Sequence, residues 1–334
     1  MVSYCEIGSE FWDVPIADQQ CLFPESTQWF LSGRSALLAI IAEQRDVRSV
    51  SLPSWCCDSM IKPFVDAGME IHFYPVYWKD GLTQEICLDR DALFLIDYFG
   101  YSTPYPDLCG YNGVVIRDVT HSLFSFSHSD ADYYFGSLRK WCGVWTGGYA
   151  WTKDGHMLDT GSDCDQEYVA LRKRAIEEKS EYIKGRRTDK GYLKVFDEAE
   201  KLLEDVRISS AADRDVELAQ HLDVETIKAR RRDNAEVLRS AFPDWRIFPT
   251  IAPTDTPMFV PVLVPDGKRD ALRSYLIKHE IYCPIHWPMS EYHTLDERTA
   301  HIYENELSLV CDQRYTEEDM NRMVDTINAF WKEV

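Results

Sequence analysis

The feature that most restricts the fold of this chain is the alternation of short apolar runs with helical patterns in its first half. Helical patterns occupy residues 35–45 and 59–68. Buried strands that alternate with helices are joined by parallel crossovers, with helices on both faces of the sheet. The sequence therefore predicts an α/β fold with a mostly parallel sheet. The apolar runs that we expect to form its strands lie at residues 50–52, 70–75, 92–98 and 113–117.

The second half of the chain has a different pattern. Residues 165–201 are highly charged and contain the basic stretch 184–187, and residues 213–242 are predicted to form one long helix. We expect a large domain over residues 1–210 and a smaller C-terminal α/β domain over residues 211–334. The further elements predicted in the smaller domain are a strand at 260–264 and helices at 269–279 and 316–331.

The composition argues against several classes of protein. The chain has 36 basic and 56 acidic residues, a formal charge of −20, and such a surface repels nucleic-acid backbones. No apolar stretch reaches the ~18 residues of a membrane span, and the acidic N-terminus lacks the regions of a signal peptide. The ten cysteines are scattered without a CxxC pair. We therefore expect a cytoplasmic protein with no metal site and no nucleic-acid or membrane partner.

The segment 114–151 carries the most chemical information. A predicted strand ends at Asp118, His121 follows it, and Ser137 precedes Lys140 by three positions. Open α/β sheets bind ligands at the carboxyl ends of their strands. Pyridoxal phosphate (PLP) needs a lysine amine for its Schiff base, an acid beside its ring nitrogen, a flat partner for the ring and donors for its phosphate. These residue types in this order suit that cofactor, although a strand-end aspartate also commonly caps a turn.

On these residues the chain resembles the DegT-type family of PLP-dependent aminotransferases, which is best known from nucleotide-sugar biosynthesis. Residues 32–37 (SGRSAL) are similar to the phosphate turn of that family, residues 118–121 (DVTH) to its D-A-A-Q or D-A-A-H segment, and Ser137-x-x-Lys140 to its lysine motif. The order and spacing of the segments carry the resemblance. Further similar segments lie at 53–56 (PSWC), 97–100 (DYFG), 211–238 with Arg230-Arg231-Arg232, 281–288 and 307–315.

The resemblance implies a fold-type-I enzyme that works as a homodimer, with its site at the subunit interface. It implies amino-group transfer from an amino acid, with glutamate the expected donor, to a keto-sugar or related carbonyl acceptor. Lys140 would bind the cofactor covalently and then move the α-proton as a general base. Asp118 would pair with the pyridinium nitrogen, and the nearby cation should keep Asp118 ionised.

The resemblance also implies contacts for the rest of the cofactor. The predicted helix that begins after Ser32 presents backbone N–H groups and a dipole that suit a phosphate, and the Ser137 hydroxyl is a further donor. Two side chains, His121 and Trp55, are candidates for the face of the ring. The residues that form the predicted phosphate turn are Gly33, Arg34 and Ser35.

Two residues are candidates for substrate contacts, and each has a structural alternative. His286 fits a structural turn equally well, and Arg314 fits a surface ion pair equally well. The basic cluster at 184–187 is typical of a solvated loop and alternatively reaches the site of a partner subunit.

Two departures from the family pattern leave other functions open. The turn before Gly147 lacks an acidic residue, and the bulky Trp141 and Trp145 are expected to narrow the entrance to the site. One alternative is a PLP-fold protein with a binding or regulatory role that has lost turnover. Another is a different PLP reaction such as dehydration, in which histidine replaces the lysine in related proteins. The presence of Lys140 favours transamination.

Overall fold

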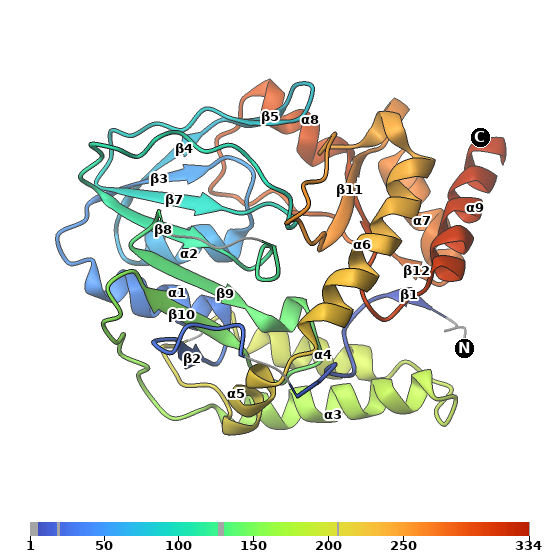
Figure 1. The fold of residues 1–334 in the computed structure, drawn as a ribbon, viewed down its shortest axis with the longest axis horizontal. Helices are drawn as coiled ribbons and strands as arrows, with labels where there is room; N and C mark the ends of the chain where they lie inside the picture. Colours follow the sequence, from blue (N-terminus) through green and yellow to red (C-terminus); the bar gives the residue numbers. More distant parts are fainter. Residues whose placement is uncertain (1–5, 19–20, 126–129, 206, 334) are drawn as a thin grey trace.

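A computed structural model describes residues 6–18, 21–125, 130–205 and 207–333 of the chain (Figure 1). Its centre is a seven-stranded sheet in the order β2-β10-β9-β8-β7-β3-β4. All neighbours from β9 to β4 are parallel, while β10 pairs antiparallel with both β9 and β2. The predicted α/β fold with a mostly parallel sheet is therefore confirmed. The strands are β2 (Gln28–Phe30), β3 (Ser49–Pro53), β4 (Glu70–Tyr74), β7 (Ala92–Ile96), β8 (Val114–Asp118), β9 (Tyr133–Ser137) and β10 (Gly148–Thr152).

Helices pack on this sheet because their apolar residues face it. Helix α1 (Gly33–Glu43) contacts β9 and β10 and buries Leu37 and Ile40, and α2 (Asp58–Asp66) contacts β4 and α1. The charged segment 165–201 forms the hairpin of α3 (Gln166–Ile183) and α4 (Tyr192–Lys201). The smaller elements of this half are the β5 (Val76–Trp78) and β6 (Leu82–Gln84) hairpin and the short helix η1 (Leu138–Lys140).

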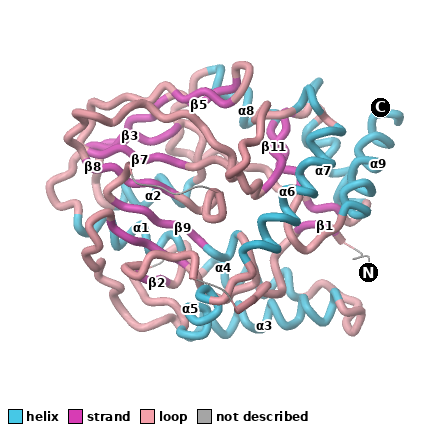
Figure 2. Tube along the Cα trace, in the orientation of Figure 1, coloured by secondary structure: helices cyan, strands magenta, loops and turns pink. Residues whose placement is uncertain are grey.

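The C-terminal part contains a second hydrophobic core. Strands β11 (Phe259–Leu263) and β13 (Glu306–Val310) pair antiparallel, while β12 (Ile281–Tyr282) pairs parallel with the N-terminal β1 (Ile7–Gly8). Figure 2 shows α6, α7 and α9 together at one end of the molecule and the seven-stranded sheet at the other. The helices of this part are α6 (Val224–Ala241), α7 (Arg269–Lys278), α8 (Glu297–Asn305) and α9 (Glu317–Glu333).

The single helix predicted over 213–242 is wrong, because the chain breaks it. Helix α5 (Asp213–Gln220) ends before His221, and α6 begins after Asp223. The Asp223 side chain accepts the Thr226 backbone N–H at 3.1 Å, and the Asp223 N–H donates to the Pro15 carbonyl at 3.0 Å. An N-cap aspartate and a backbone bond to the N-terminal segment thus stabilise the break.

Helix α6 contributes residues to both hydrophobic cores. Ile227 belongs to the core of the large sheet, whereas Ala235 and Leu238, further along the same helix, belong to the C-terminal core. The N-terminal Ile7 also joins the C-terminal core. The expected domain limits at residues 1–210 and 211–334 stay a prediction. None of the helices in the described ranges is both long and apolar enough to cross a bilayer.

Candidate active site

The topology brings Asp118 and Lys140 to the same edge of the sheet. Asp118 is the last residue of β8, and Lys140 ends the short helix η1 directly after β9, the parallel neighbour of β8. The Asp118 side chain is buried, and its Oδ1 accepts the Thr120 backbone N–H at 2.8 Å. Burial raises the pKa of Asp118 to about 6, and the nearby charge of Lys140 lowers it only in part. The two groups therefore interact electrostatically across this edge of the sheet, and burial has the larger effect on the pKa of Asp118.

The Lys140 amine is exposed and uncommitted. Within the described ranges it has no hydrogen bond or ion pair. Its charge nevertheless acts on nearby groups. Burial lowers the pKa values of His121 and His286, and the charge of Lys140 lowers them further, whereas burial raises the pKa of Cys57 and the charge of Lys140 offsets that rise in part. Lys140 therefore lies near a cluster formed by these three groups. Sequence reasoning did not select Cys57 for this cluster, because only the fold places the start of α2 beside the end of β8.

The first turn of α1 lies against the end of β9. Ser32 caps this helix by accepting the Ser35 backbone N–H at 3.2 Å, and a Cβ added to Gly33 would lie 3.4 Å from the Cβ of Ser137. The Ser137 Oγ is buried and has no hydrogen-bond partner among the described residues. A helix N-terminus beside an unpaired buried hydroxyl fits the phosphate group of PLP.

The side chains of Arg34 and Ser35 point elsewhere. The Arg34 guanidinium donates to the Leu203 carbonyl at 3.1 Å and pairs with Glu200 at 3.2 Å. The Ser35 hydroxyl donates to the Arg207 carbonyl at 2.9 Å. The backbone N–H groups of this turn are therefore the groups available to hold an anion, because the Arg34 guanidinium is engaged by Glu200 of α4 and by the Leu203 carbonyl.

His121 and Trp55 occupy different surroundings. The His121 ring is buried, and its Nδ1 accepts the Phe99 backbone N–H at 3.3 Å. Burial lowers the pKa of His121 to about 3, so the ring is neutral and carries its proton on Nε2. Trp55 is fully buried, stacks on Tyr98 at 5.0 Å and donates its Nε1–H to the His286 carbonyl at 2.7 Å. Trp55 therefore links the large sheet to the C-terminal part.

The two tryptophans near Lys140 do not narrow its surroundings, and that expectation is wrong. Trp141 is fully buried and donates its Nε1–H to the Thr120 carbonyl at 2.6 Å. The guanidinium of Arg231 lies over its ring at 4.3 Å. Trp145 is covered by the Arg214 guanidinium at 4.1 Å. Both rings are used in packing and cation–π contacts.

The turn before Gly147 obtains an acidic group from a distant helix. Asp215 of α5 accepts both the backbone N–H and the hydroxyl of Thr146, each at 2.8 Å. Its side chain is buried, and it also pairs with Arg214 at 2.8 Å. The missing acid in the sequence of this turn is therefore supplied from 69 positions along the chain, where no local pattern indicates it.

Lys140 opens into a cavity of about 440 Å³ between the N-terminal segment, η1 and the C-terminal part. Its charged lining is mainly basic, in contrast to the acidic chain as a whole. One arginine there keeps its terminal nitrogens free within the described structure: Arg273, whose Nε donates to the Cys283 carbonyl at 3.2 Å. The basic lining residues are Arg139, Lys140, Arg231, Arg273 and Arg314, and the acidic ones are Glu10 and Asp312.

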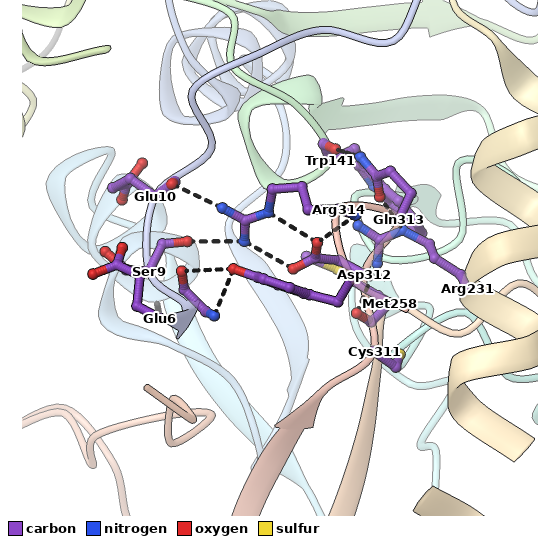
Figure 3. Close-up of polar contacts among 12 residues, drawn as sticks. Glu6, Ser9, Glu10, Trp141, Arg231, Met258, Cys311, Asp312, Gln313 and Arg314 are labelled. Atoms are coloured by element: carbon purple, nitrogen blue, oxygen red, sulfur yellow. Dashed lines mark hydrogen bonds and ion pairs between the residues drawn. The ribbon is translucent and has the colours of Figure 1, made fainter. Parts of the chain in front are cut away.

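Arg314 is neither on the surface nor free. Its guanidinium binds both carboxylate oxygens of Asp312, at 2.9 and 2.8 Å. It also donates to the backbone carbonyls of Ser9 and Glu10 (Figure 3). The ion pair is almost completely buried. Burial alone would lower the pKa of Arg314 and raise that of Asp312, but the opposite charge of each partner outweighs it, so the pKa of Arg314 is raised and that of Asp312 is lowered. Arg314 thus fastens the N-terminal segment over the cavity, and most of its donors are already used.

The remaining candidates lie on different sides of the molecule. His286 is buried at the cavity wall, where its Nδ1 bonds the Ser308 Oγ at 2.8 Å. The basic cluster at 184–187 lies in the connection between α3 and α4. Its Arg186 pairs with Glu181 at 2.6 Å and its Arg187 with Asp189 at 2.9 Å. Arg186 and Asp189 are exposed, and Glu181 and Arg187 are half-buried.

No family model matches the chain, and no curated protein matches it in sequence. Solved structures match the chain in fold. The aminotransferase PseC of Helicobacter pylori, involved in pseudoaminic acid biosynthesis, superposes with a TM-score of 0.66 at 14% identity, covering 98% of this chain and 100% of its own. A DegT DnrJ EryC1 StrS aminotransferase from Brucella abortus gives 0.61 at 15% identity, with coverages of 91% and 85%. Spr1654 of Streptococcus pneumoniae in its PLP form gives 0.62 at 13%, with coverages of 97% and 99%.

These similarities define the fold. The chain is folded like the DegT-type sugar aminotransferases, as its sequence predicted, over nearly its whole length.

Proposed function

We propose that the protein is a PLP-dependent aminotransferase that moves an amino group from an amino acid, with glutamate the expected donor, to a keto-sugar or related carbonyl acceptor. The observation that carries the proposal is the placement of the uncommitted Lys140 amine and the buried Asp118 after adjacent parallel strands, at the same edge of the sheet, with the charge of Lys140 lowering the pKa of Asp118 in part. A lysine and an acid in this relation are what the cofactor requires. The fold shared with sugar aminotransferases supports the same conclusion.

The residues present fit the parts of the cofactor. Lys140 would bind its aldehyde, and Asp118 would face its ring nitrogen. The backbone N–H groups of Gly33 and Arg34 and the orphaned Ser137 hydroxyl would hold its phosphate. When bound, PLP supplies an electron sink that makes the α-proton of an amino acid acidic.

Two side chains of the protein, Asp118 and Lys140, would act on the bound cofactor and the amino acid. Asp118, ionised above about pH 6, holds a proton on the ring nitrogen by its negative charge. The Lys140 Nζ would accept the proton from the α-carbon and return it to the carbon on the other side of the transferred nitrogen. The charge of Lys140 also contributes to the lowered pKa values of Glu10 and Glu200, so the amine lies in the field of these carboxylates as well as that of Asp118.

The cavity suits a small anionic substrate. Its volume of about 440 Å³ lies within the usual range for small-molecule sites. Arg273 offers a free guanidinium fork for a carboxylate or phosphate. Because the whole chain is acidic, such a local group of cations is what captures an anion.

We also propose a homodimer in the cytoplasm, with the site covered by the partner subunit. The exposure of Lys140 in the single chain supports this arrangement, since amino-group transfer is protected from side reactions when water is excluded. Light scattering on the purified protein measures the oligomeric state directly.

Reconstitution with PLP tests the proposed function. We expect a visible absorbance band that is lost in Lys140→Ala and kept in the control Lys153→Ala, an exposed lysine after β10. Addition of glutamate should then shift this band. A colourless wild-type protein contradicts the proposal. A band that no amino acid changes would instead indicate the binding or regulatory alternative, and release of water from the substrate without amine exchange would indicate dehydration.

A further inference from the structure

Three buried side chains form a continuous chain of hydrogen bonds at the wall of the cavity. The Ser308 hydroxyl donates to the Glu306 Oε1 at 2.5 Å and bonds the His286 Nδ1 at 2.8 Å. The second oxygen of Glu306 accepts the His286 backbone N–H at 2.7 Å. Glu306 and Ser308 are completely buried and His286 nearly so. Glu306 and Ser308 lie on β13, and His286 follows β12, so two segments meet here.

Glu306 has no ion-pair partner in the described ranges, although it is fully buried. Arg269 of α7 is the charged group that lowers the pKa of Glu306, and it offsets the effect of burial only in part. The Arg269 guanidinium itself donates to Asp270 and to the Tyr303 carbonyl. Cys283 also faces this carboxyl, and the negative charge of Glu306 raises its pKa. Burial raises the pKa of Glu306 to about 8. The carboxyl therefore gains or loses a proton close to neutral pH.

His286 stays neutral through the same range. Burial lowers its pKa well below its ordinary value, and the positive charge of Lys140 lowers it further. Aromatic rings of Phe99 and Phe259 complete its surroundings. A neutral imidazole has one N–H and one acceptor nitrogen, and the partner of one nitrogen decides the state of the other.

The proton on Glu306 therefore decides which form His286 takes. When Glu306 is ionised, it accepts the Ser308 O–H, Ser308 accepts the His286 Nδ1–H, and Nε2 is left with a lone pair. When Glu306 is protonated, its O–H donates to Ser308, Ser308 donates to Nδ1, and the proton is on Nε2. All bonds are kept in both forms, because each donor and acceptor simply exchanges roles.

We propose that Glu306, Ser308 and His286 form a neutral proton relay that presents either a donor or an acceptor at the His286 Nε2, in the cavity that also holds Lys140. His286 is the group that would contact substrate, and Ser308 and Glu306 are positioning residues that act through it. The cavity lining includes both His286 and Lys140, which places the relay beside the free amine.

The use of this relay in catalysis rests on the proposed function. Amino-group transfer exchanges a carbon–oxygen bond of the acceptor for a carbon–nitrogen bond and releases water. The departing oxygen gains two protons and the nitrogen loses two. One proton passes directly from the nitrogen to the oxygen. The Nε2–H supplies the second proton to the oxygen, Ser308 refills Nδ1, and Glu306 is left ionised. One of the protons lost by nitrogen then returns to Nε2 and resets Glu306, so no net charge is created.

The tautomer of His286 tests the relay without any cofactor. Nitrogen-15 correlation spectra of the purified protein distinguish Nδ1–H from Nε2–H for each of the nine histidines, and His286→Gln identifies the signal. We expect His286 to carry its proton on Nε2 at pH 6.5 and on Nδ1 at pH 9.5. The midpoint of the transition should lie near the pKa of Glu306, which is about 8. A single tautomer across this range in the wild-type protein overturns the proposal, whatever the variants do.

Substitutions separate the relay from simple packing. In Glu306→Gln the His286 tautomer should no longer depend on pH. In Ser308→Ala the tautomer should no longer follow the protonation of Glu306, because the connecting hydroxyl is missing. Ser308→Thr keeps a hydroxyl and should restore the pH dependence. Ser290→Ala is a matched control, because Ser290 also bonds a carboxylate, Asp58, at 2.6 Å but has no bond to His286. A transition that persists unchanged in Glu306→Gln counts against the proposal.

The failure of the relay and the failure of the proposed function give different results. If the tautomer transition is observed but the protein binds no PLP, the proposed relay stands and the proposed aminotransferase function fails. If the enzyme is active but the His286 tautomer is the same at every pH, only the proposed relay fails. In an active enzyme, the turnover number with a carbonyl acceptor should fall above about pH 8. In Glu306→Gln this fall at high pH should be absent.

Discussion

Replacing Asp118 with asparagine should change the stability of the protein and its affinity for PLP in opposite directions. In the folded chain, burial raises the pKa of Asp118 from 3.8 to about 6. A carboxyl with a higher pKa in the folded state binds its proton more tightly there, so its ionisation at higher pH destabilises the fold. Each pKa unit corresponds to about 1.4 kcal/mol, so the buried charge costs about 3 kcal/mol at pH 8.

Urea unfolding of the cofactor-free protein measures this cost. Asparagine has the same shape and keeps an oxygen for the Thr120 N–H, but it carries no charge. We expect Asp118→Asn to raise the free energy of unfolding by about 3 kcal/mol at pH 8. The gain should shrink to about 1.5 kcal/mol at pH 5 and about 0.5 kcal/mol at pH 4, and vanish near about pH 3, where the wild-type carboxyl is mostly protonated in both states. The same variant should bind PLP at least about tenfold more weakly, because the pyridinium loses its counter-charge.

Asp97 provides a matched control of opposite sign. It follows β7, the other parallel neighbour of β8, and is also buried. Its Oδ1 accepts the Arg117 Nε and Nη2 at 3.0 and 2.8 Å. Asp97→Asn should therefore lower the unfolding free energy by about 3 kcal/mol, because it weakens the pairing of a buried guanidinium. If Asp118→Asn is no more stable than wild type at pH 8, or if its gain does not decline toward pH 4, the reasoning is refuted.

Two further substitutions address the rest of the site. Ser137→Ala should weaken PLP binding about tenfold and change the unfolding free energy of the cofactor-free protein by less than about 0.5 kcal/mol, because the Ser137 Oγ has no partner among the described residues. Absorbance titration and urea unfolding check both values, and unchanged affinity contradicts the phosphate role. Arg273→Ala should raise KM for a dicarboxylic donor by roughly 10- to 100-fold with little change in kcat, since it removes a contact away from the reacting atoms. Steady-state kinetics test this, and an equal effect of Arg269→Ala, whose guanidinium bonds Asp270 and the Tyr303 carbonyl, would argue against a specific anchor.

The fold was predictable because its signals are local. The predicted strands at 50–52, 70–75, 92–98 and 113–117 overlap β3, β4, β7 and β8, since continuous apolar runs mark strands that are buried on both faces. The prediction failed at 213–242, where a helical pattern continues through the capped break at 221–223. Periodicity records which residues are apolar but not a tertiary bond such as that from Asp223 to Pro15.

The candidate site was predictable only in part. Parallel neighbours place their carboxyl ends at one edge of a sheet, so the positions of Asp118 and Lys140 after predicted strands were consistent with the shared edge at which the structure has them. The roles of Arg34 and Arg314 were not predictable in this way. Their guanidinium groups are engaged by Glu200 and Asp312, and the exposure of an arginine cannot be read from its neighbours in the chain.

The sequence by itself determined the alternation of strands and helices, the Ser32 cap of α1 and the order of the lysine and acid, because these depend on residues close together along the chain. Only the tertiary structure decided which charges are buried and which donors are already used. Thr146 meets Asp215, Gln313 meets the Trp141 carbonyl, and His286 meets Ser308 across separations of 69, 172 and 22 positions. Such contacts set the local dielectric and the hydrogen-bond partners, and these in turn set the pKa values on which the proposed chemistry depends.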